Sequence, residues 1–310
     1  MNLHIHFGVH RTGSTSLQNL LKNNKVHLLN NGFLYPHLNV DYKHTKIAWQ
    51  LLNRKINVRE LTARIDKELS ASVKTILLIS EDFSQLKNAY WLKELAKKYD
   101  LSASVYLKRQ DLWLESWYNQ HIKWPWMKKF SNSTIQEFTR SLDDFYWIDY
   151  NFLLSEICKY VPKNRLYVHT MTPENPINGI GYFFANVLSM PTPITNKEAG
   201  NMNASLSRVQ LEIVRKIDLF ELLPPQRRRI LKIVKSLEIK EDSGSKSIMS
   251  YDMRRKILSQ YAVSNGKVAK DFFDSNDLFH PLREGSICDD HDRSLIVDDY
   301  LGEIIKRLAG

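Results

Sequence analysis

Residues 3–18, LHIHFGVHRTGSTSLQ, decide the fold of this chain. Apolar side chains alternate with histidines over Leu3–Phe7, which predicts a short buried strand. Gly8 and Gly13 then bound a loop, and apolar residues at helical spacing follow the second glycine. A strand, a glycine loop and a helix N-terminus together form an anion cradle, because free backbone N–H groups and the helix dipole both point at the bound charge.

One position of this loop departs from a familiar phosphate-binding pattern. The spacing from Gly8 to Gly13, Ser14 and Thr15 matches G-x-x-x-x-G-K-[ST], except that Ser14 stands where the pattern has lysine. The cation lies instead at Arg11, before the second glycine. In nucleotide triphosphatases that lysine reaches the outer phosphates. Its absence therefore argues against a kinase.

The five residues RTGST, 11–15, resemble the 5′-phosphosulfate loop of sulfotransferases, which typically reads K-[ST]-G-[ST]-[ST]. Those enzymes take their sulfuryl group from 3′-phosphoadenosine 5′-phosphosulfate (PAPS), release 3′-phosphoadenosine 5′-phosphate (PAP), and need no metal. Arg11 replaces the usual lysine here and keeps its charge in a planar fork. The resemblance implies that Arg11 stabilises the leaving phosphate oxygen. It also implies donor binding by the loop and its flanks: His10, Arg11, Thr12, Gly13, Ser14, Thr15 and Ser16.

A second motif, SASVYLKRQDLWLESWYNQ at 102–120, predicts a strand, a turn and a helix. Arg109 falls at the carboxyl end of the strand and Ser116 about two turns into the helix, so both can face a crevice at the sheet edge. The segment resembles the bacterial branch of the sulfotransferases. The resemblance implies that Arg109 and Ser116 bind the 3′-phosphate of the donor.

Two positions are candidates for the base that removes the acceptor proton. The resemblance implies a histidine or a glutamate placed after the second or third strand. His44 follows the second predicted strand, and Glu81 ends the apolar run of the third. Histidine has the more suitable ordinary pKa for accepting a proton near neutrality. The choice between His44 and Glu81 stays open, with His37 a weaker third candidate.

The alternation of apolar runs predicts an α/β fold of the P-loop type, with three α/β/α layers around a central parallel sheet. We expect a single domain over 1–310, with a nucleotide-binding core at 1–200 and a mainly helical part at 201–310 that covers the site. A polar run at 241–247 predicts a loop. The predicted strands are 3–7, 32–35, 75–80, 104–108 and 166–169. The predicted helices are 15–24, 45–54, 58–71, 89–98, 111–123, 134–141, 149–158, 177–189, 205–220, 224–236, 250–262 and 293–308.

Composition sets the broad class of the protein. Its 310 residues are 43% hydrophobic and 25% charged, which is ordinary for a globular protein. The two cysteines, Cys158 and Cys288, form neither a disulfide framework nor a zinc spacing, so a reducing compartment is expected. The first predicted strand begins at Leu3, and no run of about 18 apolar residues occurs, so we expect neither a signal peptide nor a membrane span. These observations predict a cytoplasmic protein.

The formal net charge of +10 suits an anionic donor, an anionic acceptor or a membrane surface. It would also suit a nucleic acid, but no nucleic-acid-binding motif occurs, and we expect no such partner. The densest basic runs, 227–229 and 254–256, lie in helical patterns, and we interpret both as solvated helix faces.

The sequence therefore predicts a PAPS-dependent sulfotransferase. Its acceptor is expected to be a hydroxyl of a carbohydrate or glycolipid, since the aromatic loop 124–126 could stack on a sugar ring. A P-loop kinase or nucleotide triphosphatase is the first alternative, because ILLISED at 76–82 could be a strand that ends in a magnesium-binding acid. A non-catalytic nucleotide-binding module is the second.

Overall fold

The computed structural model describes residues 1–38, 43–85, 87, 89–172, 178–193, 206–237, 239, 247–282 and 294–309. The chain forms two compact units. Unit 1 contains 1–109, 146–200 and 261–279, and unit 2 contains 110–145, 201–260 and 280–310. The sequence placed a single boundary at residue 200, whereas the chain crosses between the units several times. Residues 241–246, most of the predicted polar loop, lie outside the described residues.

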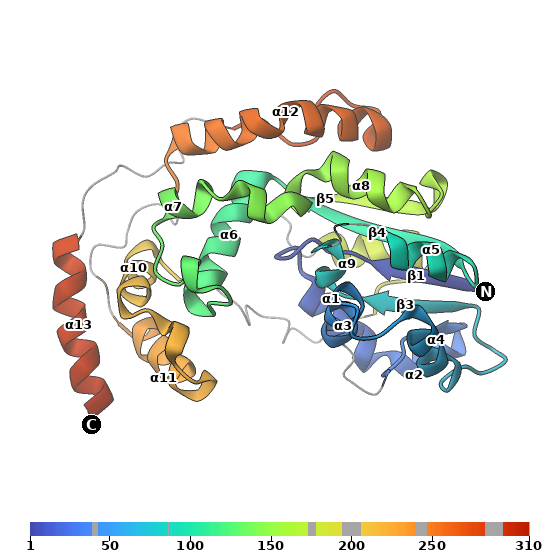
Figure 1. Ribbon diagram of the computed structural model, residues 1–310, viewed down its shortest axis with the longest axis horizontal. Coiled ribbons are helices and arrows are strands. Elements are labelled where there is room, and N and C mark those ends of the chain that lie inside the picture. The colour runs from blue at the N-terminus through green and yellow to red at the C-terminus, as the bar shows by residue number, and fades with distance from the viewer. Residues whose placement is uncertain are drawn as a thin grey trace. The chain divides into compact units, whose positions relative to one another are not determined.

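A five-stranded, all-parallel sheet lies in unit 1, with the order β2-β3-β1-β4-β5. Four of its strands, β1, β3, β4 and β5, are labelled in Figure 1. The central strand pairs with a neighbour on each side, so that His4 lies between Leu77 of β3 and Ser102 of β4. The strands are β1 (Asn2–His6), β2 (Phe33–Leu34), β3 (Thr75–Ile79), β4 (Asp100–Lys108) and β5 (Leu166–Met171).

Helical segments in the described residues make up most of the remaining chain. Those of unit 1 are α1 (Ser14–Asn23), α2 (Lys25–Asn30), α3 (Thr45–Leu52), α4 (Val58–Asp66), η1 (Glu81–Gln85), α5 (Tyr90–Ala96), α8 (Tyr150–Cys158), η4 (Lys163–Arg165), α9 (Asn178–Tyr182) and η5 (Phe183–Val187). Those of unit 2 are α6 (Gln110–Lys123), η2 (Lys128–Phe130), α7 (Ile135–Thr139), α10 (Arg208–Ile217), η6 (Leu219–Glu221), α11 (Pro224–Lys235) and α13 (Ser294–Ala309). Two segments run from one unit into the other, η3 (Leu142–Ile148) and α12 (Tyr251–Phe273).

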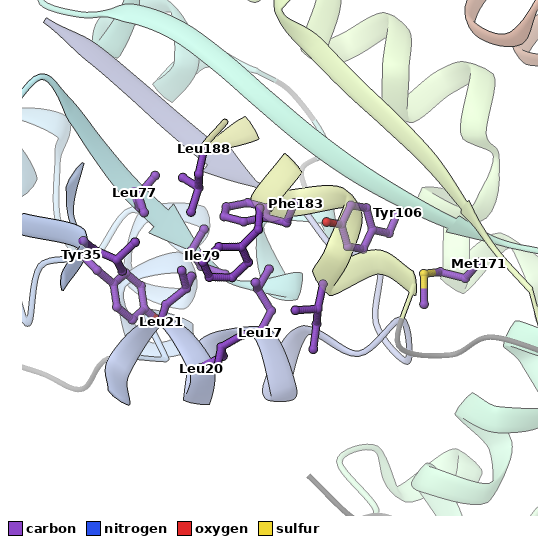
Figure 2. Packing of buried hydrophobic residues seen from close by; sticks show 13 residues of the cluster. Leu17, Leu20, Leu21, Tyr35, Leu77, Ile79, Tyr106, Met171, Phe183 and Leu188 are labelled. Carbon is purple, nitrogen blue, oxygen red and sulfur yellow. The ribbon is translucent and has the colours of Figure 1, made fainter. Parts of the chain in front are cut away.

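Helices cover both faces of the sheet. On one face, Leu17 and Leu21 of α1 and Phe183 of η5 pack in one cluster with Ile79 and Tyr106 of the sheet (Figure 2). On the opposite face, the Phe7 ring just after β1 lies 6.1 Å from the ring of Trp91 in α5. The parallel sheet is thus buried between helical layers, as parallel sheets require, and the predicted α/β fold is confirmed.

The central strands contain buried polar side chains, and because of them the sequence prediction missed the first part of β4. Strand β4 begins at Asp100, four residues before the predicted start, because Ser102 and Ser104 interrupt its apolar pattern. In the structure their hydroxyls bond to both ring nitrogens of His4 and to Nδ1 of His6. His4 Nδ1 lies 3.0 Å from Ser102 Oγ, and His6 Nδ1 lies 2.9 Å from Ser104 Oγ.

Unit 2 is helical in its described part. Helix α10 packs against α6, α11 and α13, and its inward side chains include Val209, Leu211 and Val214. A buried ion pair joins the start of α12 to α6, since Arg254 Nη1 lies 2.8 Å from Asp111 Oδ2 and Arg254 Nη2 lies 2.6 Å from Glu115 Oε2. No helix in the described part of the chain has both the length and the apolar character needed to cross a membrane.

Several elements differ from the sequence prediction. Helix α2 and the 3-10 turn η1 were not predicted, because both are too short to show a clear period. The predicted helix 177–189 is divided into α9 and a π-helical segment, η5. The predicted helix 250–262 continues as far as Phe273, through Asn265 and Gly266, which are residue types that often end a helix.

Candidate functional site

The order of the strands selects one place on the sheet for a ligand. The chain leaves β1 towards β2 at one edge and leaves β4 towards β5 at the other, so the direction of the connections reverses between β1 and β4. Ligands of open parallel sheets bind outside the carboxyl ends of the strands at such a point. The loop 8–13 leaves β1 here, and Arg109 directly follows β4.

The loop continues the sheet and then turns sharply. The amide of Val9 donates to Tyr106 O of β4 at 2.9 Å, so the pairing of β1 with β4 extends beyond His6. Gly8 has a φ of 80°, and a Cβ placed there would lie 2.8 Å from Glu81 Cα, so the position requires glycine. Arg11 also has a positive φ, 65°, which is uncommon outside glycine and occurs often at ligand sites.

The N-terminus of α1 is open to an anion. Its N-cap is Gly13, which has a φ of 87° and, being glycine, no side chain to accept from the first N–H groups, and its first turn holds no acidic residue. The first N–H groups of a helix have no intrahelical acceptor. Ser14 is only 4% exposed, and within the described residues its Oγ has no hydrogen-bond partner. A buried hydroxyl in that state calls for a ligand or a water molecule.

One charged residue lies in the loop and another lies beside it. Arg11 is half-buried, and burial lowers the pKa of its guanidinium while the charge of Glu81 opposes that shift. Glu81 is itself half-buried at the end of β3, where its Oε2 accepts from Gln18 Nε2 of α1 at 3.1 Å. The arrangement brings a cation and a carboxylate to the sheet edge beside the N-terminus of α1.

A buried histidine anchors the loop to the end of β3. His10 Nε2 lies 3.2 Å from Asp82 Oδ1, and the same oxygen accepts from Trp49 Nε1 at 3.1 Å. Ser80 Oγ donates to the other carboxylate oxygen at 3.0 Å. Burial opposes ionisation of Asp82, but its bonds to His10 and to the Ser80 and Thr45 hydroxyls outweigh that cost and lower its pKa. Asp82 thus stays charged and holds His10 in place.

His44 occupies a different environment from that expected of a base. Its side chain is fully buried, at 0% exposure. The Ile79 amide donates to Nδ1 at 3.0 Å, so the ring proton lies on Nε2, which donates to Pro36 O at 2.7 Å. Neither nitrogen offers a lone pair to a substrate. The contacts of His44 therefore fit a structural role, joining the chain before α3 to the end of β3.

Three further residues of the predicted site are Arg109, Ser116 and Thr12. Arg109 is half-buried, and the backbone just before it is fixed by Tyr150, whose hydroxyl bonds to both the N–H and the C=O of Lys108. Ser116 lies half-buried on α6, in unit 2. Within the loop, the Thr12 hydroxyl donates to Val9 O.

Three residues with structural roles in the site were not predicted as site residues from the sequence. Asp82 appeared only as a metal ligand of the kinase alternative, and Gln18 and Tyr150 did not appear at all. Their partners His10, Glu81 and Lys108 are far away in sequence, so no local pattern could have revealed them. Within the described residues, no group of three or more His, Cys, Asp or Glu side chains is placed to hold a metal ion.

Comparison with known proteins adds one partial match. No protein-family model matches the sequence. A protein of Archaeoglobus fulgidus, described as uncharacterized, is 29% identical over 181 residues. The match covers 56% of this chain and 46% of that relative, so it spans less than half of the relative's length.

Proposed function

We propose that the protein is a PAPS-dependent sulfotransferase that transfers a sulfuryl group to a hydroxyl of a carbohydrate or glycolipid. One observation carries the proposal. The loop 8–13 places the N-terminus of α1, which has no side-chain cap, at the switch point of the sheet. There Ser14, whose hydroxyl has no partner among the described residues, stands where a triphosphatase has lysine.

The residues present fit the 5′-phosphosulfate of the donor. The first N–H groups of α1 would bind its oxygens, and Ser14 Oγ would gain the partner that it lacks. Arg11, which remains protonated in proteins, supplies positive charge where the leaving phosphate oxygen develops negative charge. Arg109 at the end of β4 would pair with the 3′-phosphate. When bound, PAPS supplies an activated sulfuryl group.

The contacts favour Glu81 over His44 as the base. Glu81 is half-buried beside Gly8, whereas both ring nitrogens of His44 bond to the backbone. In the proposed transfer, the acceptor oxygen bonds to sulfur while the bond from sulfur to the phosphate oxygen breaks. The acceptor proton passes to Glu81, and PAP leaves with the electron pair of the broken bond. The protein contributes alignment and charge stabilisation.

The contacts of Asp82 argue against the kinase alternative. It would use Asp82 as a magnesium ligand. One oxygen of Asp82 already accepts from Trp49 and lies against His10, and the other accepts from Ser80. Its carboxylate thus serves to hold the loop.

The acceptor class rests on an exposed indole in unit 2. Trp126 is 53% exposed, and its ring stacks on that of buried Trp117 with centroids 5.1 Å apart. An aromatic ring fixed from beneath and open above is a suitable platform for the apolar face of a sugar.

Calorimetric titration with PAP and, in parallel, with ATP and magnesium tests the proposal. We expect PAP to bind well and ATP–magnesium weakly. Arg109→Ala should weaken PAP binding by about 10- to 150-fold, since a charge-assisted hydrogen bond contributes ~1.5–3 kcal/mol. Arg140→Ala, at an exposed arginine of unit 2, is the matched control and should bind as wild type. Tight binding of ATP–magnesium that is indifferent to Arg109 would overturn the proposal in favour of a kinase.

A further inference from the structure

Helix α11 carries a cationic face that the proposed donor site does not use. Its sequence, PPQRRRILKIVK, contains five Lys and Arg residues and no acidic residue. The apolar side of the helix packs in the core of unit 2, where Ile230, Leu231 and Val234 are buried. The charges therefore occupy the side left to the solvent.

Three of these cations form one stripe. Arg228, Lys232 and Lys235 are exposed and follow each other at spacings of four and three residues, which places them on one side of a helix. None of the three forms an ion pair with a carboxylate in the described part of the chain. Arg227 differs, because its guanidinium donates to Leu222 O and Phe220 O, each at 2.7 Å.

An apolar tip adjoins the stripe. Leu223, the residue before α11, is 66% exposed, and Pro224 and Pro225 of the first turn are exposed too. Arg229 extends the charged surface towards the end of α13, where its Nη2 donates to Leu308 O at 3.2 Å. Exposed apolar residues at the end of a cationic stripe suit a partner that offers negative charge outside and hydrocarbon beneath.

We propose that this face of α11 docks on an anionic membrane surface, with the stripe against lipid headgroups and Leu223 dipping into the interface. Each Lys or Arg near an anionic bilayer strengthens binding about fivefold, and burial of a leucine adds to this. A soluble polyanion such as a nucleic acid would use the charges but would gain nothing from Leu223. The inference does not depend on the proposed sulfotransferase activity.

Vesicle co-sedimentation of the full chain tests the proposal, with phosphatidylcholine vesicles that contain or lack phosphatidylglycerol. We expect binding only to the anionic vesicles, and weaker binding at high salt. The combined variant Arg228→Gln, Lys232→Gln and Lys235→Gln should bind about a hundredfold more weakly. The matched control removes three exposed cations from α12, Lys256→Gln, Lys267→Gln and Lys270→Gln, and should stay within a few-fold of wild type. Circular dichroism confirms that each variant is folded.

A second variant separates a membrane from a soluble polyanion. Leu223→Ser should weaken vesicle binding at least about fivefold and leave binding to heparin, a soluble polyanion, unchanged. Three results would overturn the proposal: equal binding of the α11 and α12 variants, equal binding to neutral vesicles, or vesicle binding indifferent to Leu223.

Discussion

Replacing Ser14 by alanine should change stability and ligand affinity in opposite directions. Within the described residues its hydroxyl is buried without a partner, and an unsatisfied buried polar group costs ~1–3 kcal/mol. Alanine removes that group and is a better helix former by ~0.5 kcal/mol. We therefore expect Ser14→Ala to raise the free energy of unfolding by about 1.5–3.5 kcal/mol. The same change removes a hydrogen bond to a charged ligand, worth ~1.5–3 kcal/mol, so PAP should bind about 10- to 150-fold more weakly.

Urea unfolding followed by tryptophan fluorescence measures the first quantity, and calorimetric titration with PAP measures the second. Ser259→Ala is the matched control, because Ser259 is exposed on α12 and bonds only locally, to Lys256 O at 2.8 Å. It should change stability by less than about 0.5 kcal/mol and leave affinity unchanged. A Ser14→Ala protein that is less stable than wild type, or that binds PAP as wild type does, would refute the reasoning that this hydroxyl bonds to the ligand.

Three further substitutions test the account. Gly8→Ala puts a Cβ 2.8 Å from a backbone atom just past β3, at a positive φ, and should lower the free energy of unfolding in urea by about 2–4 kcal/mol. In the control Gly266→Ala, the new Cβ meets nothing within 4 Å, and the free energy of unfolding should rise by up to about 1 kcal/mol. Similar shifts for the two variants would contradict the close approach at Gly8. Burial lowers the pKa of His6 to about 3, so between about pH 6.5 and pH 3 the unfolded chain takes up a proton that the folded chain does not. Stability should therefore fall by about 1.4 kcal/mol per pH unit of acidification from this group, and His6→Gln should lose that part of the slope in urea titrations; parallel slopes would show that His6 does not titrate this way. Arg254→Met leaves the fully buried Asp111 without its Arg254 partner and should destabilise unit 2 by about 3–5 kcal/mol. A loss of stability below about 1 kcal/mol would mean that the pair is not buried.

The fold could be predicted from the sequence where local patterns are strong. Parallel strands buried on both faces appear as apolar runs, as at Thr75–Ile79, and their alternation with helical periods predicts the α/β class. The loop after β1 was visible because a turn with positive φ at Gly8 and Gly13 demands glycine.

The order of the strands and the partners of buried polar groups were not available from local patterns. Nothing near His44 indicates that Ile79 N–H, 35 residues later, occupies its Nδ1. The serines of β4 are polar and therefore do not look like strand residues in the sequence. Their partners, the histidines of β1, lie about 100 residues earlier, so no nearby residue shows that these serines are buried and bonded. Long-range hydrogen bonds of this kind decide which candidate is a structural residue and which can meet a substrate.

The central claim is that an anion binds at the N-terminus of α1, and backbone amide shifts report on it most directly. We would record two-dimensional amide spectra of deuterated, ¹⁵N-labelled protein while adding PAP. We expect the amides of Gly13, Ser14 and Thr15 to shift most, because N–H groups at the start of a helix bind anions. Saturable PAP binding that leaves those three amides unmoved, or no binding at all, would contradict the claim.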